Sequence, residues 1–499
     1  MNANAVTART EYDCAVLIGG AVRDAPMMPV RNPARVDEIV GRVALAGVDH
    51  VEEAVRAATV AARSWAALSP HERGALLRDA AAQIEPRVEE LAALLTREQG
   101  KTLLEARSDV RGSVLCLRYF AELAEAALGE EPFRDDERAT ILLGRRPVGV
   151  TGVIVPWNSP VHLAFLGISP SLAAGNPVIV KPSEFAPLAL GEVLRILAAA
   201  LPPGVVGLLP GAAEAGAAMS AHPGIRKIFF TGSTATGKRI MSAAAGNLKR
   251  LSLELGGNDP AIVLDSAVVD DELALEVARG SFALSGQVCF GIKRIYVHRS
   301  LYAEFLDAFV AAVDRIVVGD GLREDVTMGP VNNRPQWERV QQLIEVARSS
   351  GGELRELGQQ AEPAGWDRGH FIRPTVVTGL TPDHPLVVQE QFGPVVPVLA
   401  YDGVDEVIAQ INASEFGLGA SLWSPDTAQA LALARRLESG SVFINAHRAG
   451  VSDVATPFGG FKQSGIGRGH GLPALYACLE TQAIVNVWDR TGFPPSPLH

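Results

Sequence analysis

Short apolar runs alternate with helical stretches over most of this chain beyond residue 148. VGVTGVIVPW, PVIVKPSE, GVVGLLPG and IRKIFFTGS each end at proline or glycine before a helical stretch. A second series follows from Asn258, made of DPAIVLD, CFGIKRIYVH, VVPVLAYD, ASLWSPD and GSVFINA. This alternation is typical of βαβ units, so it predicts an α/β protein with parallel sheets covered by helices.

The first 124 residues have a different pattern, a short β lead-in followed by helices. SPHE at Ser69 is a capping box with Pro70 at the first helical position, which predicts a helix running towards Ile84. Pro86 can open the next helix, and Gly100 is a suitable stop for it.

Two apolar runs, RATILLGRRPVG and TQAIVNVWD, have strand character but no helix of their own. Exposed strands need a partner, so these runs predict a small β element for oligomerisation. With a boundary near Glu254–Asp259, we expect three parts. They are a domain of residues 1–124 and 148–258, a domain of residues 259–474, and an oligomerisation element of residues 125–147 and 475–499.

Length and composition narrow the functional class. A chain of 499 residues predicts two or three domains, and its net charge of -11 argues against nucleic acid as a partner. The N-terminus lacks the pattern of a secretory signal, and glycine and proline interrupt the longest apolar stretch, so we expect no membrane partner. Four scattered cysteines form neither a disulfide framework nor a metal motif. We therefore expect a cytoplasmic protein without a metal.

Two strand ends in the first α/β series have nucleotide-binding character. FFTGSTATGK, from Phe229 to Lys238, places glycines between a strand and a helix N-terminus, which suits a phosphate. A tight turn explains the pattern equally well. VKPSE places Lys181 and Glu184 at another strand's carboxyl end, where ligands of open α/β sheets bind. A weak surface ion pair is the alternative for these two residues.

LSLELGGND carries a carboxylate, Glu254, inside an apolar run. Leu253 and Leu255 should partly desolvate it, which raises its pKa towards the range of a general base. The alternative is a solvent-facing strand residue, because Ser252 and Glu254 lie on the same side of a strand.

VPWNSP ends another strand with Asn158, whose amide, fixed by Pro156 and Trp157, could stabilise an oxyanion. A turn-forming asparagine is the alternative there.

SGQVCFG contains Cys289 at an irregular point where glycine allows a ligand to approach closely. Most free cysteines are buried and inert, and we interpret Cys14, Cys116 and Cys478 in that way. None of the ten histidines sits in a stretch that invites a Cys–His pair, so a thiol protease is disfavoured.

Seven motifs resemble those of one known family in order and spacing: PWNSP, KPSE, FTGSTATG, LELGGNDP, GQVC, EQFGPV and PFGGFKQSGIGR. Together they resemble the NAD(P)-dependent aldehyde dehydrogenase superfamily, in its hydrolytic, non-acylating branch. The resemblance extends from Asn32 to the C-terminal run AIVNVW. It implies a Rossmann-like cofactor domain beside a second α/β catalytic domain.

The resemblance also implies roles for individual residues. Cys289 would be the nucleophile, Glu254 the general base and Asn158 the side-chain donor of the oxyanion hole. Lys181 and Glu184 would hold the adenosine ribose. The other implied cofactor contacts are Pro156, Trp157, Ser183, Gly211, Phe229, Gly232, Ser233 at the pyrophosphate, Leu255, Glu390 at the nicotinamide ribose and Phe392 beside the nicotinamide.

By this likeness, the Cys289 thiolate attacks an aldehyde, hydride leaves to the nicotinamide, and a water activated by Glu254 hydrolyses the thioester. Relatives that acylate coenzyme A lack a glutamate at this position, so Glu254 favours hydrolysis. Glu184 favours NAD, because its carboxylate would repel a 2′-phosphate, while Ser183 leaves NADP use open.

The implied substrate tunnel is apolar, with small side chains among its residues. This predicts an uncharged medium-chain or aromatic aldehyde as substrate. The residues assigned to the tunnel are Ser159, Leu163, Leu166, Ala283, Val288, Phe290, Asn445 as a pocket-floor residue, and Ala449 in the 446–451 loop. One position departs from the family pattern, because Gly469 stands before His470 where the family usually has glutamate.

Two rival interpretations remain beside the hydrolytic dehydrogenase. One is a coenzyme A-acylating semialdehyde dehydrogenase, against which Glu254 argues. The other is a non-catalytic structural or binding member of the family, which predicts the loss of Cys289, Glu254 or Asn158, and none is lost. The family likeness implies a homodimer or homotetramer formed through the small β element.

Overall fold

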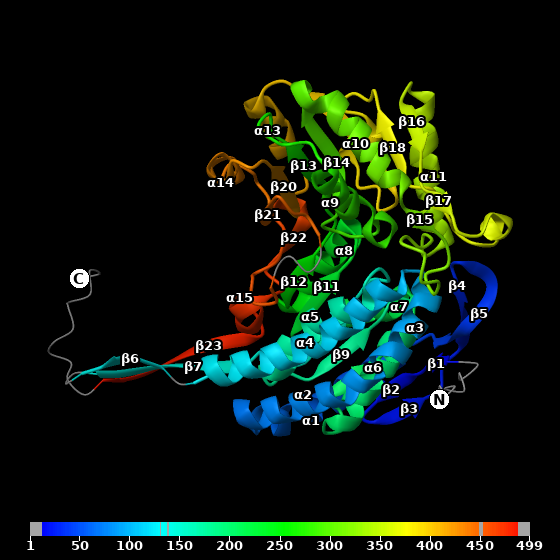
Figure 1. Ribbon diagram of the computed structural model, residues 1–499. Coiled ribbons are helices and arrows are strands. Elements are labelled where there is room, and N and C mark those ends of the chain that lie inside the picture. The colour runs from blue at the N-terminus through cyan, green and yellow to red at the C-terminus, as the bar shows by residue number, and fades with distance from the viewer. Residues whose placement is uncertain (1–11, 130, 137–138, 449–452, 488–499) are drawn as a thin grey trace, which may run out of the picture.

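A computed structural model describes residues 12–129, 131–136, 139–448 and 453–487. Two large sheets organise these residues, and a smaller one extends away from them (Figure 1). The α/β class with parallel sheets is confirmed, although strands at the sheet edges run antiparallel. No helix among the described residues is long and apolar enough to cross a membrane.

The first large sheet contains the strand ends with nucleotide-binding character. Its order is β22 (Gly465–Ile466), β12 (Arg250–Glu254), β11 (Lys227–Thr231), β8 (Thr151–Ile154), β9 (Val178–Lys181), β10 (Val206–Leu208), β2 (Val16–Ile18) and β3 (Ala21–Arg23). A three-stranded sheet of β1 (Tyr12–Cys14), β5 (Arg35–Ala44) and β4 (Met27–Asn32) lies beside it.

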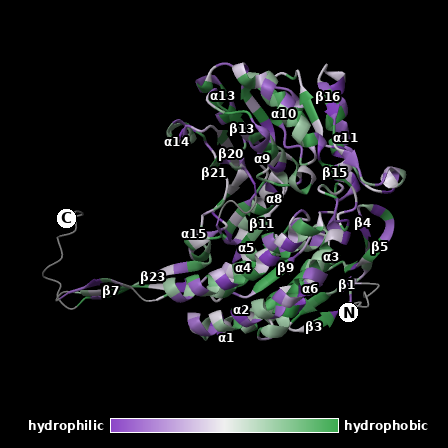
Figure 2. Ribbon diagram, in the orientation of Figure 1, coloured by the Kyte–Doolittle hydropathy of each residue, from purple (hydrophilic) through white to green (hydrophobic). Residues whose placement is uncertain are grey.

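Helices cover both faces of the first sheet, because its central strands are apolar on both sides. In Figure 2, β9 is largely green whereas α4 carries purple and green residues together. The helices of this half are α1 (Val48–Ala67), α2 (Pro70–Ile84), α3 (Val88–Gln99), α4 (Leu103–Ala127), α5 (Pro160–Ala173), α6 (Leu188–Ala200), α7 (Ala213–Ala221) and α8 (Thr234–Ala244).

The expected helix boundaries are largely confirmed in this half. Ser69 caps α2 through a capping box, Pro70 is its first residue and Ile84 its last. Gly100 ends α3 with a left-handed φ of 98°. The expectation for Pro86 needs a correction, because this proline lies in a 3-10 turn, Glu85–Arg87, that precedes α3.

The chain enters the second large sheet after β12. Its order is β16 (Glu353–Glu356), β18 (Thr375–Thr378), β19 (Val395–Tyr401), β14 (Ile292–His298), β13 (Asp259–Val263), β20 (Gly419–Trp423) and β21 (Ser441–Ile444). Alternate residues of β13 and β14 face opposite helix layers. One layer is α9 (Asp271–Phe282) and α10 (Tyr302–Asp314), and the other is α13 (Val404–Asn412) and α14 (Thr427–Ala434).

Two further helices and a two-stranded ladder belong to this half. They are α11 (Arg334–Ser349), α12 (Pro385–Val388), β15 (Val317–Val318) and β17 (Gln359–Gln360). Helix α15 (Gly471–Tyr476) packs instead against α4 and α5 of the first half, where Ala474 and Leu475 join the core.

The two apolar runs without helices pair with each other. β7 (Ala139–Pro147) lies between β23 (Leu479–Val487) and β6 (Glu131–Asp135), in a ribbon that extends from the body (Figure 1). Ile484 and Val485 of β23 remain 43% and 57% exposed. The ribbon therefore offers apolar surface, and its role in oligomerisation stays a prediction, as do the three domain boundaries.

Candidate active site

Cys289 lies in an irregular loop between α9 and β14. Just before it, Leu284 and Ser285 have left-handed φ values of 48° and 57°, and the Ser285 hydroxyl donates to the Gly329 carbonyl at 2.7 Å. The Cys289 side chain is partly exposed, whereas Cys14, Cys116 and Cys478 are buried and free. The interpretation of those three cysteines as core residues is confirmed.

Asn158 contacts the Cys289 loop from the other large sheet. It follows β8 and precedes α5, and its side-chain amide donates to the Gln287 carbonyl at 2.9 Å. The side chain is buried, so this contact is shielded from water. The contact places an amide donor against the backbone two residues before the thiol.

Glu254 is the last residue of β12, paired with Thr231 on one side and Gly465 on the other. It is only 4% exposed, which rules out a solvent-facing strand residue. Neither carboxyl oxygen has a hydrogen-bond partner among the described residues. Burial raises the pKa of Glu254 well above its ordinary value, with Arg468 opposing the shift.

The surroundings of Cys289 disfavour the thiolate in the absence of other molecules. Although the residue is partly exposed, desolvation of its sulfur raises the pKa of the Cys289 thiol to about 12, and the nearby Glu390, Asp259 and Glu254 carboxyl groups add to the shift. The Lys293 ammonium acts in the opposite direction. The thiol is therefore protonated near neutral pH.

Lys181 and Glu184 do not form the exposed ion pair considered above. Lys181 is buried, and its ammonium donates to the Pro182 carbonyl at 2.9 Å. Burial lowers the pKa of Lys181 to about 8, and Glu184 partly counteracts this shift. The Ser183 hydroxyl donates to the Glu184 carboxylate at 3.4 Å. A buried ammonium at a strand's carboxyl end suits a polar ligand.

The FFTGSTATGK turn forms a helix start as expected. Ser233 caps α8, and its hydroxyl accepts a hydrogen bond from the Thr236 amide at 3.3 Å. Gly232 donates its amide to the Glu254 carbonyl at 3.1 Å, which ties this turn to the candidate base. Leu255 packs so closely on Gly237 that a Cβ there would lie 2.7 Å from its side chain.

Glu390 and Phe392 lie between α12 and β19, in the half of the second large sheet. The Glu390 carboxylate accepts the Gly257 amide at 3.1 Å, and Phe392 has a left-handed φ of 53°. The Phe392 and Trp157 rings meet edge to face at 5.5 Å. Residues assigned to the cofactor on both large sheets are therefore adjacent.

The family-model comparison covers most of the chain. The aldehyde dehydrogenase family model matches residues 22–484. The chain belongs to the aldehyde dehydrogenase family. Members are oxidoreductases that act on the aldehyde group, so the predicted enzyme class is confirmed.

Individual relatives support this assignment. A betaine aldehyde dehydrogenase of Brucella anthropi is 37% identical, over 93% of this chain and 96% of its own length. An alpha-ketoglutaric semialdehyde dehydrogenase of Bacillus subtilis is 35% identical, over 88% and 90%. Among solved structures, betaine aldehyde dehydrogenase from Staphylococcus aureus in complex with NAD+ superposes with a TM-score of 0.90. Its sequence is 33% identical, and the match covers 95% of this chain and 94% of that chain.

Phe290, a residue assigned to the predicted substrate tunnel of this dehydrogenase, begins a row of ring contacts. Phe290 meets Phe458 at 5.4 Å between ring centres, Phe458 meets His470 at 5.7 Å, and His470 meets His162 at 6.3 Å. The side-chain amide of Asn445, the predicted pocket-floor residue, accepts a hydrogen bond from the Ser424 backbone N–H and donates one to the Ser424 carbonyl. Ala449 lies outside the described residues.

Gly469, the position that departs from the family pattern, lies against the candidate base. A Cβ on this glycine would be 3.5 Å from a Glu254 carboxyl oxygen. The glycine amide donates to the Phe458 carbonyl at 2.7 Å. Because this dehydrogenase has glycine at position 469, no side chain from that position contacts the Glu254 carboxyl.

Sequence reasoning missed several charged groups around Cys289. Lys293 lowers the pKa of the Cys289 thiol, and Arg468 lowers the pKa of the Glu254 carboxyl. Asp259 raises the pKa of the thiol, and although it lies in the motif LELGGNDP, no role was assigned to it. His447 lies in the 446–451 loop and hydrogen-bonds the carbonyl of Phe290, the residue after the candidate nucleophile. Nothing in the local sequence pattern distinguishes His447, because the contact joins residues 157 positions apart.

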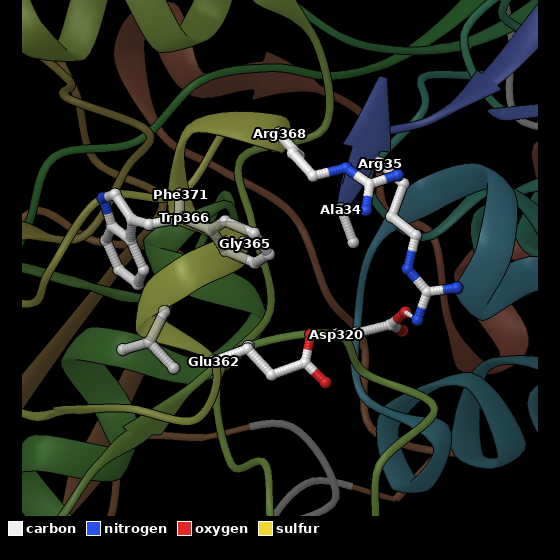
Figure 3. A pocket seen from close by; sticks show the side chains of 10 residues that line it. Ala34, Arg35, Asp320, Glu362, Gly365, Trp366, Arg368 and Phe371 are labelled. Carbon is white, nitrogen blue, oxygen red and sulfur yellow. Dashed lines mark ion pairs between the residues drawn. The ribbon is translucent and has the colours of Figure 1, made fainter. Parts of the chain in front are cut away.

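A small pocket elsewhere in the dehydrogenase is not the aldehyde site. Its cavity of about 30 Å³ holds little more than a water molecule. Figure 3 shows the Arg35 guanidinium beside the Asp320 carboxylate, an ion pair of 2.7 Å. None of the predicted site residues lines this pocket.

The raised pKa of Cys289 predicts slow thiol alkylation near neutral pH. Because a thiol with a raised pKa loses its proton only as pH rises, we expect the iodoacetamide rate to climb between pH 7 and 10 without a plateau. Peptide mass spectrometry after timed quenching would measure this rate. A plateau below pH 8.5 would contradict the pKa assigned here, and Cys116 is the buried internal control.

Proposed function

We propose that this enzyme oxidises an uncharged medium-chain or aromatic aldehyde to the carboxylic acid, with NAD as cofactor. The observation that carries the proposal is the position of Cys289. Its thiol lies in a loop held by Asn158, within the electrostatic reach of the buried, unpaired Glu254 carboxyl. A nucleophile, an amide donor and a base are the three groups that oxidation through a thioester requires.

The proposed chemistry begins at the Cys289 sulfur, which attacks the aldehyde carbon once the thiol proton has passed to water. The backbone N–H of Cys289 and the Asn158 amide stabilise the developing oxyanion. Bound NAD would supply the acceptor for the hydride that leaves the carbon attached to Cys289. Glu254 then removes a proton from water, which hydrolyses the thioester on Cys289 and releases the acid.

The residues present suit a dinucleotide. Lys181 keeps a buried ammonium at a strand end, and α8 offers its N-terminus behind Ser233. Trp157 and Phe392 provide an aromatic edge beside the Cys289 loop. Glu184 supports NAD over NADP because its carboxylate repels a 2′-phosphate, although an NADP-dependent Escherichia coli enzyme is also similar, at 32% identity.

The groups around the tunnel support an uncharged substrate. Phe290 and Phe458 provide apolar rings next to the nucleophile. Arg448, a cation of the 446–451 loop, pairs with Glu276 at 2.9 Å instead of facing a substrate carboxylate. The relatives are named for betaine aldehyde and for a semialdehyde, which are both charged, so this proposal separates the enzyme from them.

A panel of aldehydes tests the substrate class. We expect kcat/KM for hexanal or benzaldehyde to exceed that for betaine aldehyde or succinic semialdehyde by at least tenfold, because burying an unpaired charge is costly. NADH formation at 340 nm measures each rate. A preference for either charged aldehyde would refute the substrate class while leaving the aldehyde chemistry intact.

Transfer of the acyl group to coenzyme A is the second candidate reaction. The buried Glu254 carboxyl favours water over coenzyme A as the acceptor of the acyl group. Product analysis with and without coenzyme A decides between them. Free acid formed at the same rate in both reactions supports hydrolysis, and an acyl-coenzyme A product refutes it.

A further inference from the structure

His447 is a buried histidine next to the nucleophile loop, and the reaction derived above does not use it. It is 1% exposed and follows β21 after a turn in which Asn445 has a left-handed φ of 54°. Asparagine tolerates this conformation, and the turn brings the imidazole back towards β20. The Phe443 ring lies 5.1 Å from the imidazole, between ring centres, and restricts its position.

A chain of hydrogen bonds fixes the orientation of the imidazole. The Trp423 indole N–H donates to the Ser421 hydroxyl oxygen at 3.0 Å, and this hydroxyl lies 2.9 Å from His447 Nδ1. Because the hydroxyl already accepts from the indole, its own proton is available for Nδ1. The tautomer with hydrogen on Nε2 therefore satisfies all of these contacts.

His447 Nε2 faces the nucleophile loop and a buried carboxylate together. It lies 2.8 Å from the Phe290 carbonyl oxygen, to which it donates, and 3.4 Å from Asp259 Oδ2. Neither Asp259 oxygen has a hydrogen bond among the described residues, and the Lys293 ammonium is a second polar group within electrostatic reach of this carboxylate. The side chains of His447 and Asp259 are 0% and 1% exposed, respectively.

Asp259 is confined between the nucleophile loop and β20 by two glycines. A Cβ on Gly257 would lie 2.5 Å from the Cys289 carbonyl and 2.8 Å from the Asp259 carboxylate. A Cβ on Gly419 would lie 2.2 Å from the same carboxylate. These close approaches leave the Asp259 carboxylate and the imidazole packed directly behind the Cys289 backbone.

We propose that His447, oriented by Ser421 and packed beside Asp259, is a positioning residue for Cys289. The nucleophile loop is then fixed on both sides of the thiol, by Asn158 at the Gln287 carbonyl and by His447 at the Phe290 carbonyl. Fixing these two carbonyls sets the Cys289 backbone N–H and the Phe290 ring against the aldehyde. This inference rests on the proposed function, because it assigns His447 to the attack step.

His447→Phe keeps a ring of similar size but removes the donor. We expect kcat for the preferred aldehyde to fall about 100-fold with KM changed less than about threefold, because small misplacements of a nucleophile slow the chemical step by this amount. His447→Gln, which can donate to the Phe290 carbonyl, should recover kcat to within about tenfold of wild type. His298→Phe is the matched control, because His298 lies at the far end of β14.

Hydrogen exchange of the peptide covering residues 283–292 gives a readout independent of any aldehyde. Exchange should be faster in His447→Phe than in wild type, and normal in His447→Gln and His298→Phe. Failure of the wild-type protein to oxidise aldehydes would refute the proposed function, but the exchange rates of residues 283–292 could still be compared among the variants. If His447→Phe does not fold, Ser421→Ala replaces it in the test. We expect a smaller fall in kcat and a smaller rise in exchange, because this variant removes the Ser421 contact to His447 and keeps the imidazole.

Two outcomes would overturn the positioning role. One is a folded His447→Phe protein, or a Ser421→Ala protein in its place, with kcat within about threefold of wild type and normal exchange. The other is a His447→Gln protein as slow as His447→Phe, because the donated hydrogen bond would then be irrelevant and His447 would only fill space.

Discussion

Replacing Cys289 with serine is expected to lower kcat for aldehyde oxidation by roughly 10³-fold or more, since loss of an enzyme nucleophile has effects of at least this size. A serine hydroxyl ionises far less readily than a thiol, and a thioester cannot form on it. NADH formation at 340 nm measures the loss. NAD binding, followed by quenching of tryptophan fluorescence, should remain within a few-fold of wild type.

Cys116→Ala is the matched control for this substitution. Cys116 is fully buried in the helical core around α4, away from the Cys289 loop, so its removal should leave kcat unchanged. Full NADH production by Cys289→Ser would remove Cys289 from the nucleophile role. Absence of oxidation in the wild-type protein, across the whole aldehyde panel, would instead support a non-catalytic member of the family.

Most of the strand pattern could be predicted because buried parallel strands are locally distinctive. The runs around β8, β9 and β13 are rich in apolar residues, since helices cover both faces of each sheet, whereas β14 also buries Lys293 and Arg294. Capping signals placed α2 correctly, because a capping box satisfies helix N–H groups within four residues. The antiparallel strand β22 was not expected, because its two residues acquire strand geometry only by pairing with β12.

The candidate catalytic groups could be proposed from family motifs, but their surroundings could not be predicted. Glu254 could be recognised by its apolar neighbours, and the structure confirms its burial. The link between Asn158 and Gln287 joins residues 129 apart, and the link from His447 to Phe290 joins residues 157 apart. No periodicity in the sequence encodes such contacts, because they depend on how the two large sheets and the 446–451 loop pack together.

Replacing Glu254 with glutamine is expected to separate the two halves of the reaction. Glutamine keeps the size of the side chain but cannot take a proton from water, so thioester hydrolysis should slow by roughly 10²–10⁴-fold. Formation of the thioester should persist as a burst of about one NADH per active site. Stopped-flow absorbance measures the burst, and mass spectrometry of quenched protein should detect the acyl group on Cys289.

The pH dependence of the wild-type enzyme provides the matching test of Glu254. Burial raises the pKa of this carboxyl well above its ordinary value, so the form that accepts a proton becomes more populated as pH rises. Hydrolysis should therefore speed up with pH in wild type and become much less pH-dependent in Glu254→Gln. If that variant turned over at the wild-type rate without a burst, another group would be the base.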